Sequence, residues 1–79
     1  MYLCISGFAP NHSDDDLIKF ELDVDGSFKD QILKVLGHKS LSSMAEGEWL
    51  LTDEQITLVS GIIGQALPSD LKLLIGVEA

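Results

Sequence analysis

Hydrophobic and polar residues alternate along two stretches of this chain in the way that is typical of β-strands with one solvated face. Between Ile18 and Asp25 every second residue is apolar, and the residues between them are charged. The same period returns over residues 71–78, where the odd-numbered positions are all apolar. Residues 2–8 are rich in β-favouring side chains and predict a further strand, which we expect to pair with residues 17–25 as an antiparallel hairpin.

Two segments show helical spacing instead. Ser27 can cap a helix whose apolar positions share one stripe and which ends at Gly37, with Asp30 completing a weak capping box. Thr52 and Gln55 form a second capping-box pattern, and a helix with an apolar stripe follows it. The polar, serine-rich residues 38–47 predict an irregular connector, and residues 48–51 predict a short extended segment.

This succession of elements predicts a fold of the α+β class. We expect two layers: an antiparallel or mixed sheet of three to four strands, with two helices on one face, in the order ββαβαβ. The other face of the sheet would carry Glu21 and Asp23. A chain of 79 residues has room for one core, so residues 1–79 are expected to form a single domain.

The net charge of the chain limits the kinds of molecule that we expect it to bind. The chain has 13 acidic residues against five lysines and no arginine, which gives a net charge of −8. Such a surface repels phosphates and membrane headgroups and accelerates encounters with cationic proteins. We therefore expect a basic protein as partner, and neither direct binding of nucleic acid nor association with a membrane. The amino-terminal residues lack the pattern of a signal peptide, and a cytoplasmic location is the expectation.

Metal sites find little support in the sequence. Residues 21–26 resemble the opening of a calcium loop, but the twelfth position is Ile32, where a bidentate glutamate is needed. His12 and the following Asp14, Asp15 and Asp16 offer imidazole and carboxylate ligands in a generic acidic turn, so no metal or other cofactor is expected.

The sequence also shows no set of residues that is typical of a catalytic site. Cys4 is the single cysteine, which excludes an intrachain disulfide and a zinc site built from cysteines. It lies among apolar residues of a predicted strand, where a free cysteine is usually a packing residue. We expect a binding protein with no catalytic residues and no enzymatic activity.

Trp49 has two interpretations. A single tryptophan in a small domain commonly anchors the core, which is the favoured interpretation. An exposed Trp49 beside Glu46 and Glu48 would instead be a contact point for a basic partner. The residues predicted to bind the partner are Glu21, Asp23, Asp25, Glu46, Glu48 and Trp49.

The chain also resembles a known class of proteins. Residues 47–55 (GEWLLTDEQ), the Ile63-Gly64 helix end, the Asp70-Leu71-Lys72 approach to the last strand and the early segments 5–8 and 20–22 carry the likeness. In these segments the chain resembles small acidic bacterial immunity proteins of polymorphic and contact-dependent growth-inhibition toxin systems. The resemblance implies a cytoplasmic protein that binds a cognate basic toxin, often a nuclease, and neutralises it by occluding its active site.

The alternative is a small structural or assembly domain that forms homo-oligomers, a homodimer in the simplest case, through a free edge of its sheet. A metal-dependent or hydrolytic enzyme that uses His12 and the neighbouring aspartates is the third hypothesis.

Overall fold

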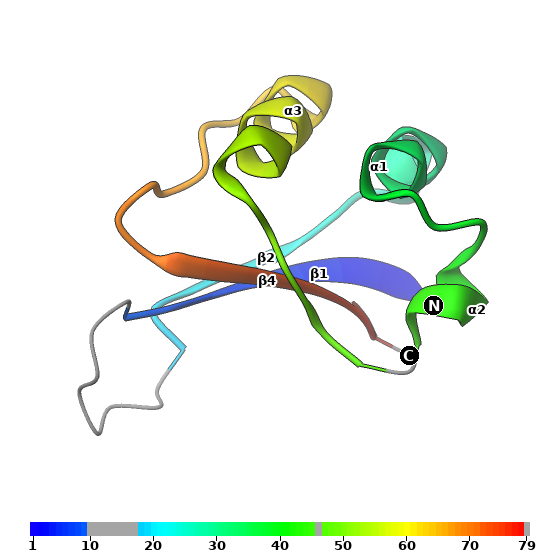
Figure 1. The fold of residues 1–79 in the computed structure, drawn as a ribbon, viewed down its shortest axis with the longest axis horizontal. Coiled ribbons are helices and arrows are strands. Elements are labelled where there is room, and N and C mark those ends of the chain that lie inside the picture. The colour runs from blue at the N-terminus through cyan, green and yellow to red at the C-terminus, as the bar shows by residue number, and fades with distance from the viewer. Residues whose placement is uncertain (10–17, 46, 79) are drawn as a thin grey trace.

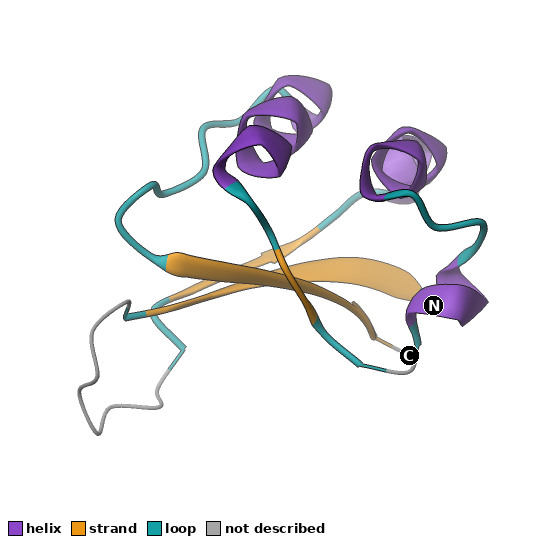
Figure 2. Ribbon diagram, viewed as in Figure 1, coloured by secondary structure: helices purple, strands orange, loops and turns teal. Residues whose placement is uncertain are grey.

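The strands of the protein form one antiparallel sheet. The structure is a computed structural model that describes residues 1–9, 18–45 and 47–78. The sheet order is β2-β1-β4-β3, and Figure 2 shows its four strands in orange. The strands are β1 (Tyr2–Phe8), β2 (Phe20–Asp23), β3 (Trp49–Leu50) and β4 (Lys72–Glu78). The helical elements are η1 (Gly26–Phe28), α1 (Lys29–Leu36), α2 (Leu41–Met44) and α3 (Asp53–Ile63). The predicted α+β class is confirmed.

The two longer helices, α1 and α3, lie side by side on one face of the sheet, as predicted (Figure 1). The core fills the space between these two layers. Ile5 of β1 and Ile75 of β4 are opposite each other in the register, and both are fully buried. Ile32 of α1 and Val59 of α3 are also fully buried and belong to the same cluster. Because side chains alternate between the faces of a strand, the neighbouring residues of β1 and β4 point to the opposite face.

The strand β2 is shorter than the alternating pattern predicted. It spans Phe20–Asp23, with Ile18 exposed before it, and Leu17 lies outside the described residues. Asp25 leaves the strand because its carboxylate accepts a hydrogen bond from the Ser27 N–H at 2.8 Å. The prediction that Ser27 caps α1 is therefore wrong: Asp25 caps the short helix η1, and α1 begins after it. Gly37 ends α1 as expected, with a left-handed φ of 78°.

The connector before β3 is not wholly irregular, contrary to the prediction. Its residues 41–44 form the helix α2, which the sequence analysis missed. The side chain of Ser40 accepts from the Ser43 N–H, and the Ser43 hydroxyl oxygen accepts from the Ser40 N–H. Met44 at the end of α2 is fully buried. Reciprocal capping together with burial of this side chain explains why so short a helix forms.

The helix α3 follows its predicted signals closely. Gln55 N–H donates to the Thr52 hydroxyl at 3.2 Å, and Thr52 N–H donates to the Gln55 side-chain oxygen at 3.0 Å. Gly64 ends the helix with a φ of 67°, a conformation that glycine adopts without strain. The loop from α3 then leads into β4, whose buried Leu73 and Ile75 confirm the alternation predicted for the last strand.

Candidate partner-binding face

One side of the sheet is covered by neither α1 nor α3 (Figure 1). We call this side the open face. Its described residues come from alternate positions of three strands and from the segment at β3, and they are Tyr2, Cys4, Ser6, Phe8, Glu21, Asp23, Glu48, Leu50, Lys72, Leu74, Gly76 and Glu78. Its apolar side chains lie toward the β3 edge, where Leu50 of the edge strand lies opposite Leu74 of β4 and is 57% exposed. Apolar contacts beside polar groups are common in protein interfaces.

Carboxylates lie at both edges of this face and at one end of it. Glu21 and Asp23 are exposed and lie opposite Ser6 and Cys4 across the β1–β2 ladder. Glu78 is exposed and lies opposite Tyr2. Glu48 reaches over β4, because a Cβ atom built on Gly76 would be 3.1 Å from the Glu48 Cγ. Lys72 lies on the same face, opposite Phe8.

The pKa of Tyr2 reflects this convergence of charge. The Asp23 carboxylate raises it most, followed by partial burial and the Glu78 carboxylate, because each disfavours the negatively charged phenolate. Tyr2 is 37% exposed, so its ring is accessible at the corner where the two acids meet. A tyrosine between carboxylates presents both an apolar surface and negative charge to a cationic side chain.

Cys4 lies deeper in the same face. Its side chain is 7% exposed, and burial is the main cause that raises the pKa of the thiol; the neighbouring Asp23 carboxylate adds to the effect. The thiol therefore stays protonated, which supports a packing role for Cys4.

A chemical experiment can check the contact between these two residues. Replacing Asp23 by asparagine removes a charge that raises the pKa of the Cys4 thiol, so a larger fraction of the thiol becomes thiolate at a given pH. We expect iodoacetamide to alkylate Cys4 severalfold faster in Asp23→Asn, measured by mass spectrometry under native conditions. Asp53→Asn, at the start of α3, should leave the rate unchanged. Equal rates in the two variants would contradict the electrostatic contact.

The other predicted site residues lie elsewhere. Asp25 is exposed at the end of β2, and the backbone N–H of Ser27 and then its side chain hold the pKa of the Asp25 carboxyl below its ordinary value. Asp25 is thus engaged in capping η1. Glu46 lies outside the described residues.

Trp49 points to the helix side of the sheet, since it lies opposite the buried Ile75. Its indole Nε1–H donates to the Met44 carbonyl oxygen at 3.3 Å, and its ring packs against His38 with centroids 4.7 Å apart. The side chain is 38% exposed and joins α2 to the end of the sheet. The structure therefore does not bring Trp49 together with Glu21 and Asp23.

Sequence reasoning missed Tyr2, Leu74 and Glu78 as members of the site. They lie at alternate positions of the first and last strands. Their gathering with Asp23 on one face depends on β1 pairing with both β2 and β4, and this order of strands is not encoded in any local pattern.

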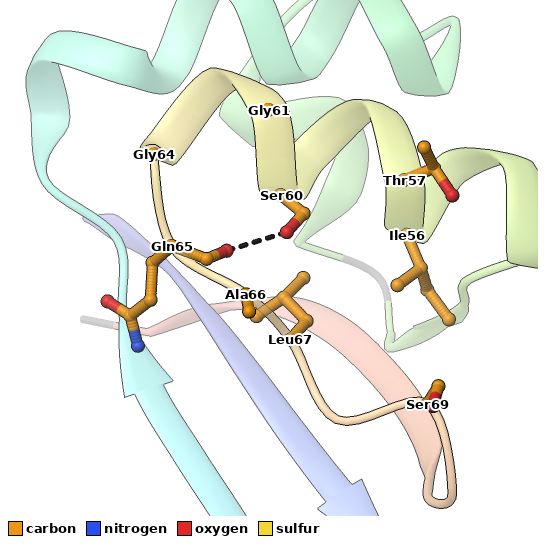
Figure 3. Close-up of a pocket in the computed structure, with 9 residues that line it drawn as sticks. All are labelled: Ile56, Thr57, Ser60, Gly61, Gly64, Gln65, Ala66, Leu67 and Ser69. Atoms are coloured by element: carbon orange, nitrogen blue, oxygen red, sulfur yellow. Dashed lines mark hydrogen bonds between the residues drawn. The ribbon is translucent and has the colours of Figure 1, made fainter.

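A groove also lies beside α3. Its volume is about 450 Å³, and it runs along the helix from Ile56 to the loop at Ser69 (Figure 3). The Ser60 hydroxyl donates to the Gln65 carbonyl oxygen at 2.6 Å, which ties the loop to the helix. None of the described residues that line the groove is acidic, basic or a thiol. Its hydroxyl groups, such as that of Ser60, have no base among these residues that could activate them, so the open face is the stronger candidate site.

Comparisons of the chain with protein families, with curated proteins and with solved structures find no match.

None of the helices in the described part of the chain is long and apolar enough to cross a membrane. Nor do the described His, Cys, Asp and Glu side chains gather in a group of three or more that could hold a metal ion. The predicted alternative at His12 and its neighbouring aspartates falls outside the described residues.

Proposed function

We propose that the protein is an immunity protein that acts in the cytoplasm, where it binds and neutralises a cognate basic toxin, a nuclease domain, by occluding the active site of that toxin. The observation that carries the proposal is the open face, an uncovered side of the sheet that carries four described carboxylates and, toward the β3 edge, the exposed Leu50 beside Leu74. The resemblance to acidic immunity proteins supports the same function.

The physical basis is charge complementarity joined to apolar contact. With a net charge of −8, the protein attracts a cationic partner at long range, and such attraction increases the rate of association. Leu50, Leu74 and Tyr2 then supply contact area that excludes water and slows dissociation. A nuclease is a fitting partner because its substrate groove is cationic, and a protein that presents carboxylates competes with the phosphates of the substrate.

The test compares two double variants with the same net charge. Glu21→Lys with Asp23→Lys reverses charge on the open face, whereas Asp30→Lys with Glu54→Lys reverses exposed charges in the first turns of α1 and α3. We expect the first pair to weaken binding of the purified cognate toxin domain at least about tenfold and the second less than about twofold. Calorimetry measures the affinities, and growth of cells expressing the toxin reports neutralisation.

Two results would contradict the proposal. Equal weakening by both pairs would show that net charge matters and the open face does not. An affinity that resists both the reversals and an increase from low to high salt would show that the acids do not steer binding. Thermal unfolding of each variant verifies that a loss of binding is not a loss of the fold.

A further inference from the structure

The free edge of β2 offers backbone hydrogen-bonding groups beside the open face. Val24 N–H donates to the Leu3 carbonyl oxygen at 2.8 Å, and the register places Leu22 opposite Ile5 and Phe20 opposite Gly7. In an antiparallel ladder, alternate residues of a strand bond to the same neighbour. The backbone N–H and C=O groups of Phe20, Leu22 and Val24 therefore face β1, and those of Glu21 and Asp23 point away from the sheet.

β2 is the outer strand of the sheet on this side, and no further described strand pairs with it. The opposite edge is formed by β3, which has two residues against the four of β2. An unpaired edge is a template on which an extended segment from another chain can form a strand. The β2 edge is the longer of the two templates.

A hollow of about 160 Å³ lies beside the same edge, and its lining combines apolar side chains with Asp23, Asp25 and Gln65. Leu22 of β2, Phe28 and Ile63 contribute to its walls, and all three side chains are half-buried. Figure 3 shows the Gln65 side chain pointing from the loop after α3 toward β2, where it also lines the hollow. Because apolar cavities of about 150 Å³ hold a molecule as large as benzene, the hollow has room for an aliphatic side chain.

We propose that the β2 edge takes up an extended segment of the basic partner as an additional antiparallel strand, with cationic and aliphatic residues in alternation. This inference rests on the proposed function and specifies how the toxin is engaged. The cationic side chains lie on the open face against Glu21 and Asp23, and an aliphatic side chain between them turns toward Leu22 and the hollow. Opposite charges on directly facing residues stabilise a pair of strands, and the backbone bonds fix its register.

A second copy of this chain is a poorer occupant of the edge. If two β2 strands paired antiparallel about Leu22, Glu21 of one copy would face Asp23 of the other. Like charges directly opposite each other destabilise a strand pair. The alternation of charge on β2 thus favours a basic segment over self-association.

The experiment uses the peptide acetyl-Lys-Val-Lys-Val-Lys-Val-Lys-amide and two backbone-methylated forms of it. Paired with Glu21 and Asp23, the lysine N–H groups of the added strand donate to β2, and the valine N–H groups point to solvent. We expect the form N-methylated at its lysines to bind at least about tenfold more weakly than the form N-methylated at its valines, because it lacks the donors. The two forms have the same charge and the same amino-acid sequence, and they differ by one N-methyl group, so a tenfold difference in affinity cannot come from net charge. Titrations followed by NMR of the labelled protein give both affinities.

Amide hydrogen exchange supplies the second readout. On binding of the unmodified peptide, the Glu21 and Asp23 N–H groups should become protected, whereas exchange of the N–H of Asp30, an exposed residue in α1, should not change. Strand addition would be overturned if the peptide did not bind, or if it bound without protection of Glu21 and Asp23. It would also be overturned if the two methylated forms bound equally or if the valine-methylated form bound more weakly. If the unmodified peptide bound without that protection, it would be docking on the open face and not on the β2 edge, and the proposed function would not be contradicted. Failure of the toxin-binding test above would instead overturn the function itself.

Discussion

Replacing Ile75 by alanine is expected to lower the free energy of unfolding by about 3–4 kcal/mol, which is the usual cost of truncating a fully buried isoleucine. Ile75 is 0% exposed and lies between Ile5 of β1 and Trp49 of β3 in the register. Its side chain therefore joins three strands under the two helices. A chain of this length has about 4–12 kcal/mol of total stability, so the variant loses a large part of it.

Urea denaturation followed by tryptophan fluorescence measures this loss, since Trp49 is the one tryptophan of the chain. Leu58→Ala is the matched control because it removes an apolar side chain that is 47% exposed on α3. We expect the control to change stability by less than about 1 kcal/mol, since surface substitutions have small effects and alanine favours helix. Equal losses in both variants would show that Ile75 is not at the centre of the core.

Local patterns in the sequence were enough to predict the class of fold and most of its elements. Alternation predicted β2 and β4, β-favouring side chains predicted β1, and the capping box at Thr52 predicted where α3 begins. These signals are local because each depends on residues a few positions apart. α2 was missed because the burial of Met44, which gives the helix its tertiary support, depends on packing against segments distant in sequence.

The candidate site was predicted in part for a similar reason. Alternation identified Glu21 and Asp23 as a solvated face, and the structure places both on the open face. The contribution of Tyr2 and Glu78 required the pairing of the first strand with the last. Trp49 was grouped with Glu48 because they are neighbours in sequence, but adjacent residues of an extended segment point to opposite faces. That alternation separates Trp49 from the carboxylates on the open face.

Gly7→Ala is expected to destabilise the protein by about 1–3 kcal/mol, the usual cost of overfilling a packed core. A Cβ atom on Gly7 would lie 2.9 Å from the Phe20 Cβ, 3.0 Å from a Leu71 methyl carbon and 3.1 Å from a Leu73 methyl carbon. The leucine methyl groups can rotate, but the Phe20 Cβ is fixed by the backbone of β2. The strand β2 must therefore move away from β1, and the entropic gain of about 0.4–1 kcal/mol from replacing glycine does not offset that strain.

Gly76→Ala is the matched control for this strain because it adds the same methyl group to the strand that pairs with β1 on the other side. The nearest atom to its new Cβ would be the Cγ of the exposed Glu48 side chain, at 3.1 Å, and this side chain can turn toward solvent. Gly76 is buried beneath Glu48, but because that side chain can move, we expect stability within about 0.5 kcal/mol of the parent chain in urea denaturation. Since β2 carries Glu21 and Asp23, Gly7→Ala should also weaken binding of the proposed partner at temperatures where it remains folded. Equal stability of the two glycine variants would show that β1 and β2 are not in the close contact that positions these acids.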